Sequence, residues 1–345
     1  MKHALSFDDV LLVPKYSEVL SRTKVETETF LTKTPDLKLK IPIISSPMTT
    51  VTEDKMAQAL ADVGGVGVIH RFHSGEGEDE MCGIKEQVEQ VKKVKGLKGF
   101  ALGINGLWQT RVELNIEAGA DFAMIDIAHG NQIRHLEVIK EFKKRWPHFP
   151  LIGGNVADGD GVRNLCDAGV DGIRVGVGGG SLCTTRVMTG FGVPSITSLQ
   201  LCRKVIDANR FEVTLIQDGG IRFPADLVKS IAAGADAVIL GGLFAGCIES
   251  PAKPNYNPYT RQFESKYMGS ASAAAKGKRE FIEGAEKTVP VKGEVSMLIQ
   301  HLVEGLQSGL SYAGAHNLKQ LRENAEFIQI TQNGLNESHP HLLYS

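Results

Sequence analysis

The sequence lacks a strong excess of either charge, and it contains no basic tract. Its 345 residues include 38 lysines and arginines against 40 aspartates and glutamates, for a formal net charge of -2. Nucleic acids and anionic membrane surfaces attract proteins through basic patches, so neither is expected as the main partner. Apolar runs are also much shorter than a membrane-spanning helix requires.

Cysteines are few, and none of them has the spacing of a metal site. The chain has five, at Cys82, Cys166, Cys183, Cys202 and Cys247, with no C-x-x-C pair. A zinc site built on cysteine pairs and a disulfide framework are therefore not expected. The first nine residues lack the apolar core of a signal peptide. Together these features predict a cytoplasmic protein.

Short apolar, β-rich runs alternate eight times with segments of helical periodicity. Continuous apolar strands flanked by helices indicate a parallel sheet, and eight such units predict an α/β fold of the (β/α)8 TIM-barrel type. An open doubly wound sheet would need a dinucleotide fingerprint after an early strand, and none is present. The expected strands are 41–45, 66–69, 100–104, 122–127, 151–154, 172–175, 213–217 and 237–240, and the expected helices 53–62, 80–95, 109–117, 132–145, 159–168, 196–208, 224–233 and 295–305.

Residues 248–294 form a long insertion after the eighth strand. A connection of this length is uncommon in a compact domain unless it serves as a lid. Its position places it at the carboxyl ends of the strands, where mobile loops close over barrel substrates. We therefore expect residues 1–345 to form one barrel domain with 248–294 as an active-site flap. Residues 1–40 are expected to be irregular with strand pieces such as 24–29.

A glycine-rich loop, 176–186, follows the sixth predicted strand and contains Cys183. Glycines allow tight turns and close backbone approach to a ligand, and they free N–H and C=O groups for an ion. A thiol in that setting, with hydroxyls at positions 181, 184 and 185, is well placed to act as a nucleophile. The alternative, a buried packing residue, is the interpretation for Cys82, Cys166 and Cys202, which lie within helical patterns.

Glycine pairs follow the last two predicted strands, at positions 219–220 and 241–242. Bare backbone N–H groups at that end of a barrel are the usual phosphate site, so a phosphorylated ligand is expected. Asp218 would accept hydrogen bonds from ribose hydroxyls or cap the following helix. His129 is as consistent with a structural role as with general-base catalysis, and His70 is ambiguous as well. Met48 and Met268 are interpreted as apolar walls.

Several of these motifs occur together and in the order found in one family. They are Ser45-Ser46-Pro47-Met48, Gly154-Asn155-Val156, Ser181-Leu182-Cys183-Thr184-Thr185, Asp218-Gly219-Gly220-Ile221-Arg222 and Gly269-Ser270-Ala271. Over nearly its whole length the chain resembles the IMP dehydrogenase and GMP reductase family. The resemblance implies a TIM barrel, usually tetrameric, that binds a purine nucleotide and a nicotinamide cofactor. The family's cysteine attacks C2 of the purine, and hydride moves between C2 and nicotinamide.

The resemblance also implies residue roles. Cys183 would be the nucleophile, with Thr185 and Glu283 as the proton-transfer pair. An activating potassium ion would use carbonyls of Gly178, Gly180 and Cys183, although Gly179 stands where the family usually has proline. The nucleotide would be held by Ser46, Ser181, Asp218, Gly220, Gly241, Gly242, Met268 and Gly269, and the nicotinamide side by Asp126, Asn155 and Met48.

Two features of the sequence differ from the dehydrogenases of the family. Family dehydrogenases usually carry regulatory modules of the CBS type between the second helix and the third strand, where this chain has no room for them. They also carry an Arg-Tyr pair in the flap that activates water, whereas here Arg279 is followed by Glu280. These differences favour an NADPH-dependent GMP reductase that converts GMP to IMP and ammonia.

The tail Glu337-Ser338-His339 instead resembles dehydrogenases, which keeps IMP dehydrogenase, converting IMP to XMP with NAD, as the alternative. A nucleotide-binding regulator without catalysis and a flavin-dependent barrel oxidoreductase are alternatives from other classes.

Overall fold

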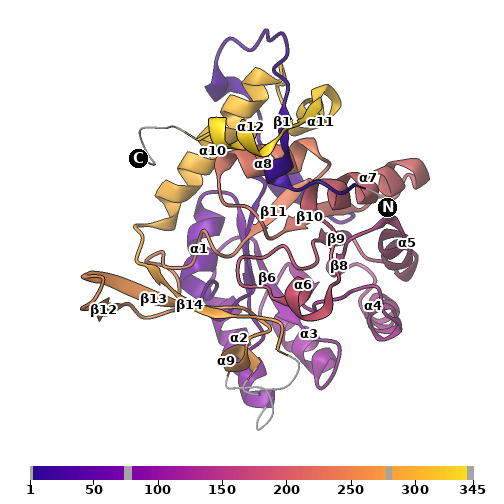
Figure 1. The fold of residues 1–345 in the computed structure, drawn as a ribbon. Helices are drawn as coiled ribbons and strands as arrows, with labels where there is room; N and C mark the ends of the chain where they lie inside the picture. The colour runs from indigo at the N-terminus through magenta and orange to yellow at the C-terminus, as the bar shows by residue number, and fades with distance from the viewer. Residues whose placement is uncertain (1–2, 74–79, 277–281, 340–345) are drawn as a thin grey trace.

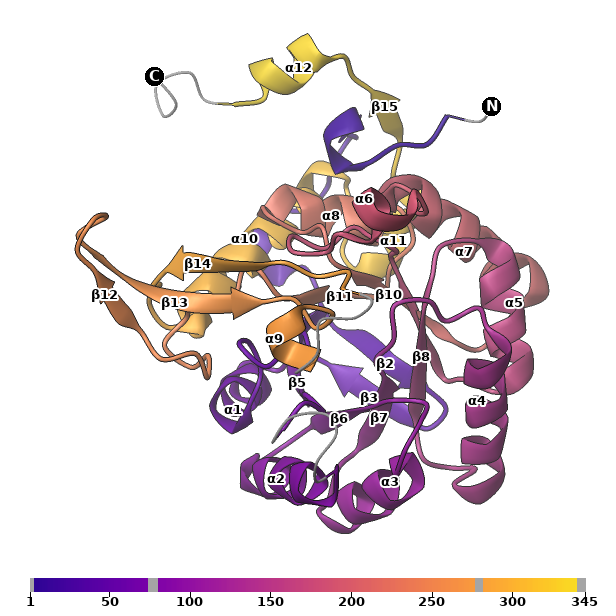
Figure 2. The same cartoon turned by 60° about the horizontal axis from the view of Figure 1, so that its bottom comes forward.

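The computed structural model describes residues 3–73, 80–276 and 282–339, with the backbone alone for Ala274 and Lys276. Eight parallel strands close into a barrel in the order β10-β11-β4-β5-β6-β7-β8-β9. Helices surround this barrel, as Figures 1 and 2 show. The predicted TIM barrel is therefore confirmed. Its strands are β4 (Ile43–Ser45), β5 (Val66–Ile69), β6 (Lys98–Leu102), β7 (Phe122–Ile125), β8 (Leu151–Val156), β9 (Gly172–Val175), β10 (Thr214–Asp218) and β11 (Ala237–Leu240).

Each barrel strand is followed by a helix that packs on its outer face. The eight helices are α1 (Asp54–Asp62), α2 (Glu80–Lys93), α3 (Trp108–Glu117), α4 (Ile133–Arg145), α5 (Gly159–Ala168), α7 (Ser195–Asn209), α8 (Pro224–Ala232) and α10 (Val295–Tyr312). Residues 94–97 connect α2 directly to β6. No helix within the described ranges combines the length and apolarity needed to cross a membrane.

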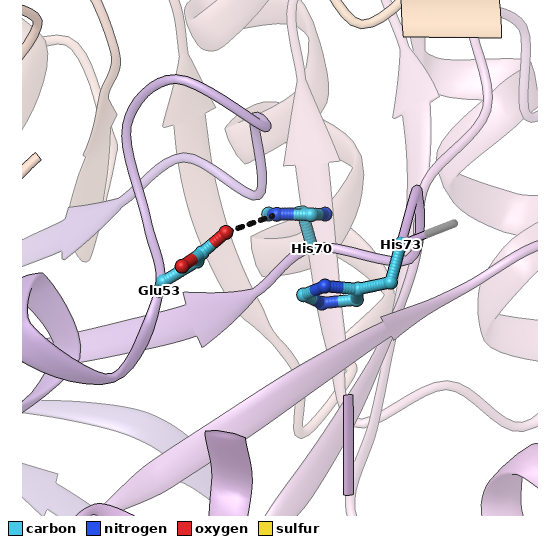
Figure 3. A group of neighbouring side chains, drawn as sticks. All are labelled: Glu53, His70 and His73. Atoms are coloured by element: carbon cyan, nitrogen blue, oxygen red, sulfur yellow. Dashed lines mark hydrogen bonds and ion pairs between the residues drawn. The ribbon is translucent and has the colours of Figure 1, made fainter. Parts of the chain in front are cut away.

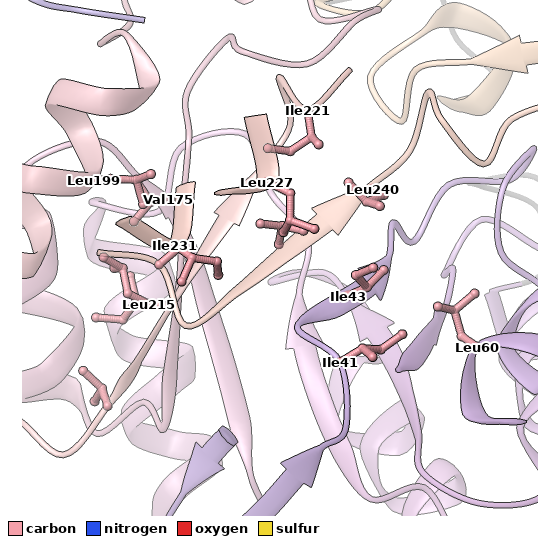
Figure 4. Close-up of a cluster of buried hydrophobic side chains, with 14 of the residues drawn as sticks. Ile41, Ile43, Leu60, Val175, Leu199, Leu215, Ile221, Leu227, Ile231 and Leu240 are labelled. Atoms are coloured by element: carbon pink, nitrogen blue, oxygen red, sulfur yellow. The ribbon is translucent and has the colours of Figure 1, made fainter. Parts of the chain in front are cut away.

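The barrel has two apolar layers because side chains alternate along each strand. Outward-facing residues such as Ile43, Leu215 and Leu240 pack against the helices, where they meet Leu60 and Leu227 (Figure 4). Inward-facing residues fill the barrel itself. They are Ile44, Val66, Val68, Ala101, Phe122, Met124, Ile152, Ile216, Ala237 and Ile239.

An antiparallel hairpin closes the amino-terminal end of the barrel. It consists of β2 (Thr29–Lys33) and β3 (Asp36–Leu39), and its Leu31 and Leu39 are buried against the interior cluster. Thr214 Oγ1 donates to the Leu31 carbonyl at 2.7 Å, which ties the hairpin to β10. The strand expected at 24–29 is wrong: a 3-10 turn, η2 (Arg22–Lys24), precedes extended chain, and the strand starts at Thr29.

Segments near the two ends of the chain pair with each other beside the barrel. After the 3-10 turn η1 (Phe7–Asp9), β1 (Val10–Leu12) pairs antiparallel with β15 (Phe327–Gln329). Two short helices, α11 (Leu318–Asn324) and α12 (Gln332–Glu337), flank β15 in the sequence.

The predicted flap contains a sheet that the sequence did not indicate. Its antiparallel strands are β12 (Asn255–Asn257), β13 (Gln262–Met268) and β14 (Glu286–Pro290), and a short helix, α9 (Ala273–Lys276), follows β13. In Figure 2 this sheet projects from the side of the barrel. Polar and charged residues separate Phe263, Tyr267 and Val289 in these strands, so the sequence shows no continuous apolar run there.

Candidate active site

A cavity of about 450 Å³ opens at the carboxyl ends of the barrel strands, bounded on one side by the flap. Loops after the strands converge there because all eight strands run in the same direction. Of the predicted site residues, Met268 alone is outside the lining formed by described residues. The others line it: Ser46, Met48, Asp126, Asn155, Gly178, Gly180, Ser181, Cys183, Thr185, Asp218, Gly220, Gly241, Gly242, Gly269 and Glu283.

Cys183 is exposed to this cavity and begins a short chain of hydrogen bonds. Its Sγ lies 3.2 Å from Thr185 Oγ1, and Thr185 Oγ1 donates to Glu283 Oε2 at 2.6 Å. Because the hydroxyl proton is directed to the carboxylate, the hydroxyl oxygen is left to accept from the thiol. The arrangement can move a proton between the reacting thiol and Glu283.

Backbone pairing holds the flap against the cysteine loop. Thr184 N–H donates to the Glu283 carbonyl at 2.9 Å, and Ala285 N–H donates to the Leu182 carbonyl at 2.8 Å. Cys183 and Gly284 thus form an antiparallel β-bridge. A Cβ at Gly284 would lie 2.7 Å from Ser272 N, so glycine permits the flap to fold this tightly. The nucleophile and the carboxylate, 100 positions apart, are positioned by this pairing.

Thr185 begins α6 (Thr185–Thr189), and Arg186 on the same helix braces the glycine loop. Its guanidinium donates to the Val177 carbonyl at 3.1 Å and to the Val193 carbonyl at 2.8 Å. The Gly180 carbonyl, one of the potassium ligands implied by the resemblance, accepts the Cys183 N–H at 3.1 Å. A carbonyl has two lone pairs, so this oxygen keeps one for a cation, and carbonyl oxygens suit hard cations.

The glycine pairs form the part of the cavity that best fits a phosphate. Gly219 and Gly220 both have φ of +85°, a conformation that other residues rarely adopt. A Cβ at Gly242 would lie 2.8 Å from Ser181 Oγ, which itself is 3.0 Å from the Tyr267 hydroxyl. Burial raises the pKa of Tyr267, so this hydroxyl remains protonated and can donate a hydrogen bond.

Arg174 lines the cavity and holds two of its carboxylates in place, and the sequence analysis did not identify it. Its guanidinium donates to Asp218 Oδ2 at 2.6 Å and to Asp126 Oδ1 at 3.1 Å, and its side chain is only 5% exposed. Burial lowers the pKa of Arg174, but the carboxylates of Asp218 and Asp126 outweigh it and raise the pKa overall. A charged residue inside the apolar strand β9 was the signal that could have identified it.

Asn155 links the same group to the cavity. Its Nδ2 donates to Asp218 Oδ2 and to the Gly176 carbonyl, both at 2.8 Å. Its Oδ1 is buried and has no hydrogen-bond partner among the described residues. A buried amide oxygen beside a cavity is suited to receive a donor from a ligand, because leaving it unpaired is costly.

The histidines and remaining cysteines lie elsewhere. His129 is exposed and is not part of the described cavity lining. His70 is buried and contacts Glu53, next to the cavity residues Arg71 and Phe72. Burial raises the pKa of Cys166 and Cys202 to about 12, which agrees with packing roles. Arg279 and Glu280 lie outside the described residues.

The sequence was compared with family models and with known proteins. The model of the IMP dehydrogenase / GMP reductase domain matches residues 4–341. An inosine-5'-monophosphate dehydrogenase of Borreliella burgdorferi is 36% identical over 100% of this chain and 98% of its own length. The Cryptosporidium parvum enzyme of that name is also 36% identical, over 98% and 94%. A third, from Aquifex aeolicus, is 33% identical over 99% and 96%.

The cavity at the strand ends, its cysteine loop and the match over almost the whole sequence lead to one assignment. The chain belongs to the IMP dehydrogenase / GMP reductase family of oxidoreductases.

Proposed function

We propose that this chain is an IMP dehydrogenase, which oxidises IMP to XMP with NAD. The observation that carries the proposal is the chain of Cys183, Thr185 and Glu283 at a cavity with a glycine phosphate site. That chemistry serves both reactions of the family. The choice between them rests on the relatives described above, which are all named IMP dehydrogenases, and on the tail Glu337-Ser338-His339. These observations favour the alternative over the reductase that the flap sequence suggested.

In the proposed mechanism the thiolate of Cys183 adds to C2 of the purine. NAD, when bound on the side of Asp126, Met48 and Asn155, would supply the hydride acceptor that the oxidation of C2 requires. Water then adds at C2 and the C2–S bond breaks with its electron pair on sulfur, which releases XMP and returns the Cys183 thiolate. IMP, NAD and water thus yield XMP, NADH and a proton. Thr185 relays the proton of the thiol to Glu283 through the bonds of 3.2 and 2.6 Å. Glu283 releases this proton to solvent before it accepts, again through Thr185, the proton of the attacking water.

The remaining site residues orient the two ligands. Gly220, Gly241, Gly242, Ser46 and Ser181 would surround the phosphate, and Asp218, fixed by Arg174, would receive the ribose hydroxyls. Gly269, which lines the cavity, would contact the base, whereas Met268 lies outside the described lining and is assigned no contact. Asp126, Met48 and Asn155 would face the nicotinamide, and the unpartnered Oδ1 of Asn155 fits an amide donor such as the carboxamide. A potassium ion would be held by carbonyls of Gly178, Gly180 and Cys183.

GMP reductase with NADPH is the second candidate. It is favoured by the flap, where Arg279 is followed by Glu280 rather than by the tyrosine expected of a dehydrogenase. A dehydrogenase would then depend on Thr185 and Glu283 to activate water. A homotetramer, a cytoplasmic location and the absence of CBS-type modules remain predictions. The alignments to relatives span 403 and 476 positions, so those relatives contain segments beyond the 345 residues of this chain.

Paired assays on one preparation test the proposal. One contains IMP, NAD and potassium, and the other contains GMP and NADPH. NADH formation confined to the first is expected, and the Cys183→Ala protein should be inactive in it. NADPH consumption with ammonia release confined to the second would establish the reductase instead. Inactivity in both would support the nucleotide-binding regulator.

A further inference from the structure

Three side chains outside the proposed catalytic chain meet beside the active-site cavity. His70 follows β5, His73 follows three residues later, and Glu53 immediately precedes α1. One nitrogen or oxygen atom from each lies within 4.8 Å of the others. Figure 3 shows the two imidazoles stacked with the carboxylate reaching the upper ring, and their centroids are 4.0 Å apart.

Both imidazoles are withdrawn from solvent, with side chains 3% and 6% exposed, while Glu53 is 31% exposed. His73 Nε2 is buried and has no hydrogen-bond partner among the described residues. A buried imidazole nitrogen without a partner is costly unless a ligand occupies it. Glu53 is also at the N-terminal cap of α1 but makes no side-chain capping bond there, and its Oε1 instead lies 3.4 Å from His70 Nε2.

We propose that Glu53, His70 and His73 form a binding site for a zinc-like divalent transition metal. Two imidazole nitrogens and one carboxylate oxygen are a recurrent three-residue donor set for zinc, with a water molecule as the fourth ligand. The exposed side of Glu53 gives that water access to the site. This site does not depend on the proposed reaction, because none of its ligands belongs to the Cys183 chain.

Charged side chains near the three proposed ligands affect how well they could hold a metal. Glu86 Oε2 lies 4.0 Å from His73 Nδ1, close to the position of a carboxylate that orients a metal-bound histidine. Glu53 and Glu86 offset the metal's charge, whereas the nearby Arg111 opposes it.

Metal binding requires a local rearrangement at His70. Its Nδ1 accepts the Phe72 N–H at 3.2 Å, so in the neutral ring the proton resides on Nε2 and faces Glu53. The metal displaces that proton from Nε2, the ring proton moves to Nδ1, and the Phe72 bond is given up. The stacked rings must also tilt, because in-plane lone pairs of parallel rings do not converge on one ion.

A metal at this site would also affect the active-site cavity. Arg71 and Phe72, between the two histidines, line the cavity, and the Arg71 guanidinium lies 4.2 Å from the Phe72 ring centroid. A metal held by His70 and His73 would fix both ends of this turn. The site therefore serves to set the position of one wall of the cavity.

Zinc titration of the untagged, chelator-treated full-length chain tests the proposal, with a chromophoric chelator as competitor. One zinc per chain is expected, with a rise in melting temperature and, with cobalt in its place, visible bands of a tetrahedral ion. His73→Ala and Glu53→Gln should each weaken zinc binding by at least ~10-fold. Their melting temperatures without metal report whether they remain folded.

Two variants address competing zinc ligands. Cys183→Ala removes the exposed thiol and His339→Ala removes a histidine of the exposed tail, and both should bind zinc as the unaltered chain does. Zinc binding that is lost in either of these variants, or that survives in folded His73→Ala and Glu53→Gln, would overturn the proposal. So would the failure of the unaltered chain to bind zinc. None of these outcomes depends on which purine reaction the enzyme catalyses.

Discussion

Replacement of Thr185 by valine tests the proton path most directly. Valine keeps the shape of threonine but removes the hydroxyl that lies 3.2 Å from Cys183 Sγ and 2.6 Å from Glu283 Oε2. General acid-base transfer contributes about 10²- to 10⁴-fold to enzymatic rates. At 1.36 kcal/mol for each tenfold, the activation barrier should therefore rise by about 3–5 kcal/mol.

Steady-state NADH formation from IMP measures the effect. Because proton transfer occurs in the transition state, kcat and kcat/KM should fall together, with KM little changed. Thr185→Ser is the matched control, since it keeps the hydroxyl and should retain kcat within about tenfold of wild type. Iodoacetamide labelling of Cys183 and the melting temperature show that the thiol and the fold survive. Valine activity above a tenth of wild type, or serine activity as low as valine, would refute the proton path.

Three further predictions follow from the burial and pairing of individual groups. Arg174→Met should destabilise the protein by about 3–5 kcal/mol in urea unfolding because it leaves buried carboxylates unpaired, whereas exposed Arg163→Met should change stability by less than about 0.5 kcal/mol. Iodoacetamide with mass spectrometry should modify Cys183 well before Cys202, whose buried thiol has a pKa of about 12, and equal rates would contradict this. Burial alone would raise the pKa of Asp236, but its two guanidinium partners outweigh burial and hold the pKa below its usual value. The free energy of unfolding should therefore fall as the pH drops below about 4. Asp236→Asn should make this fall with pH shallower, and an unchanged dependence on pH would count against the pairing.

Much of the barrel could be predicted because its determinants are local. Each strand is an apolar run short enough to be distinguished from a helix, and the expected 213–217 is observed as Thr214–Asp218. The cavity followed from topology, since parallel strands place all their carboxyl ends on one face. The predicted site residues therefore came together although no single motif contains them.

Other features could not be predicted, because they depend on contacts distant in sequence. The hairpin that closes the barrel is polar on one face. Burial of its leucines could not be predicted, because it depends on contact with the interior cluster of the barrel. The flap sheet is mostly exposed, and its buried Tyr267 joins the main apolar cluster through contacts that are distant in sequence. In the sequence Arg174 only interrupts an apolar strand, and its partners become visible in the fold: Asp218 at the end of the neighbouring strand β10, and Asp126 directly after β7.

The β-bridge between Cys183 and Gly284 couples the position of the flap to that of the nucleophile. If the flap lifts to exchange ligands, the backbone bonds of Thr184 and Ala285 must break, and the cysteine loop loses the support of Glu283. An open enzyme is then an unreactive one, because the proton acceptor leaves together with the lid. Reactivity of the thiol is thereby confined to the interval in which the substrate is enclosed.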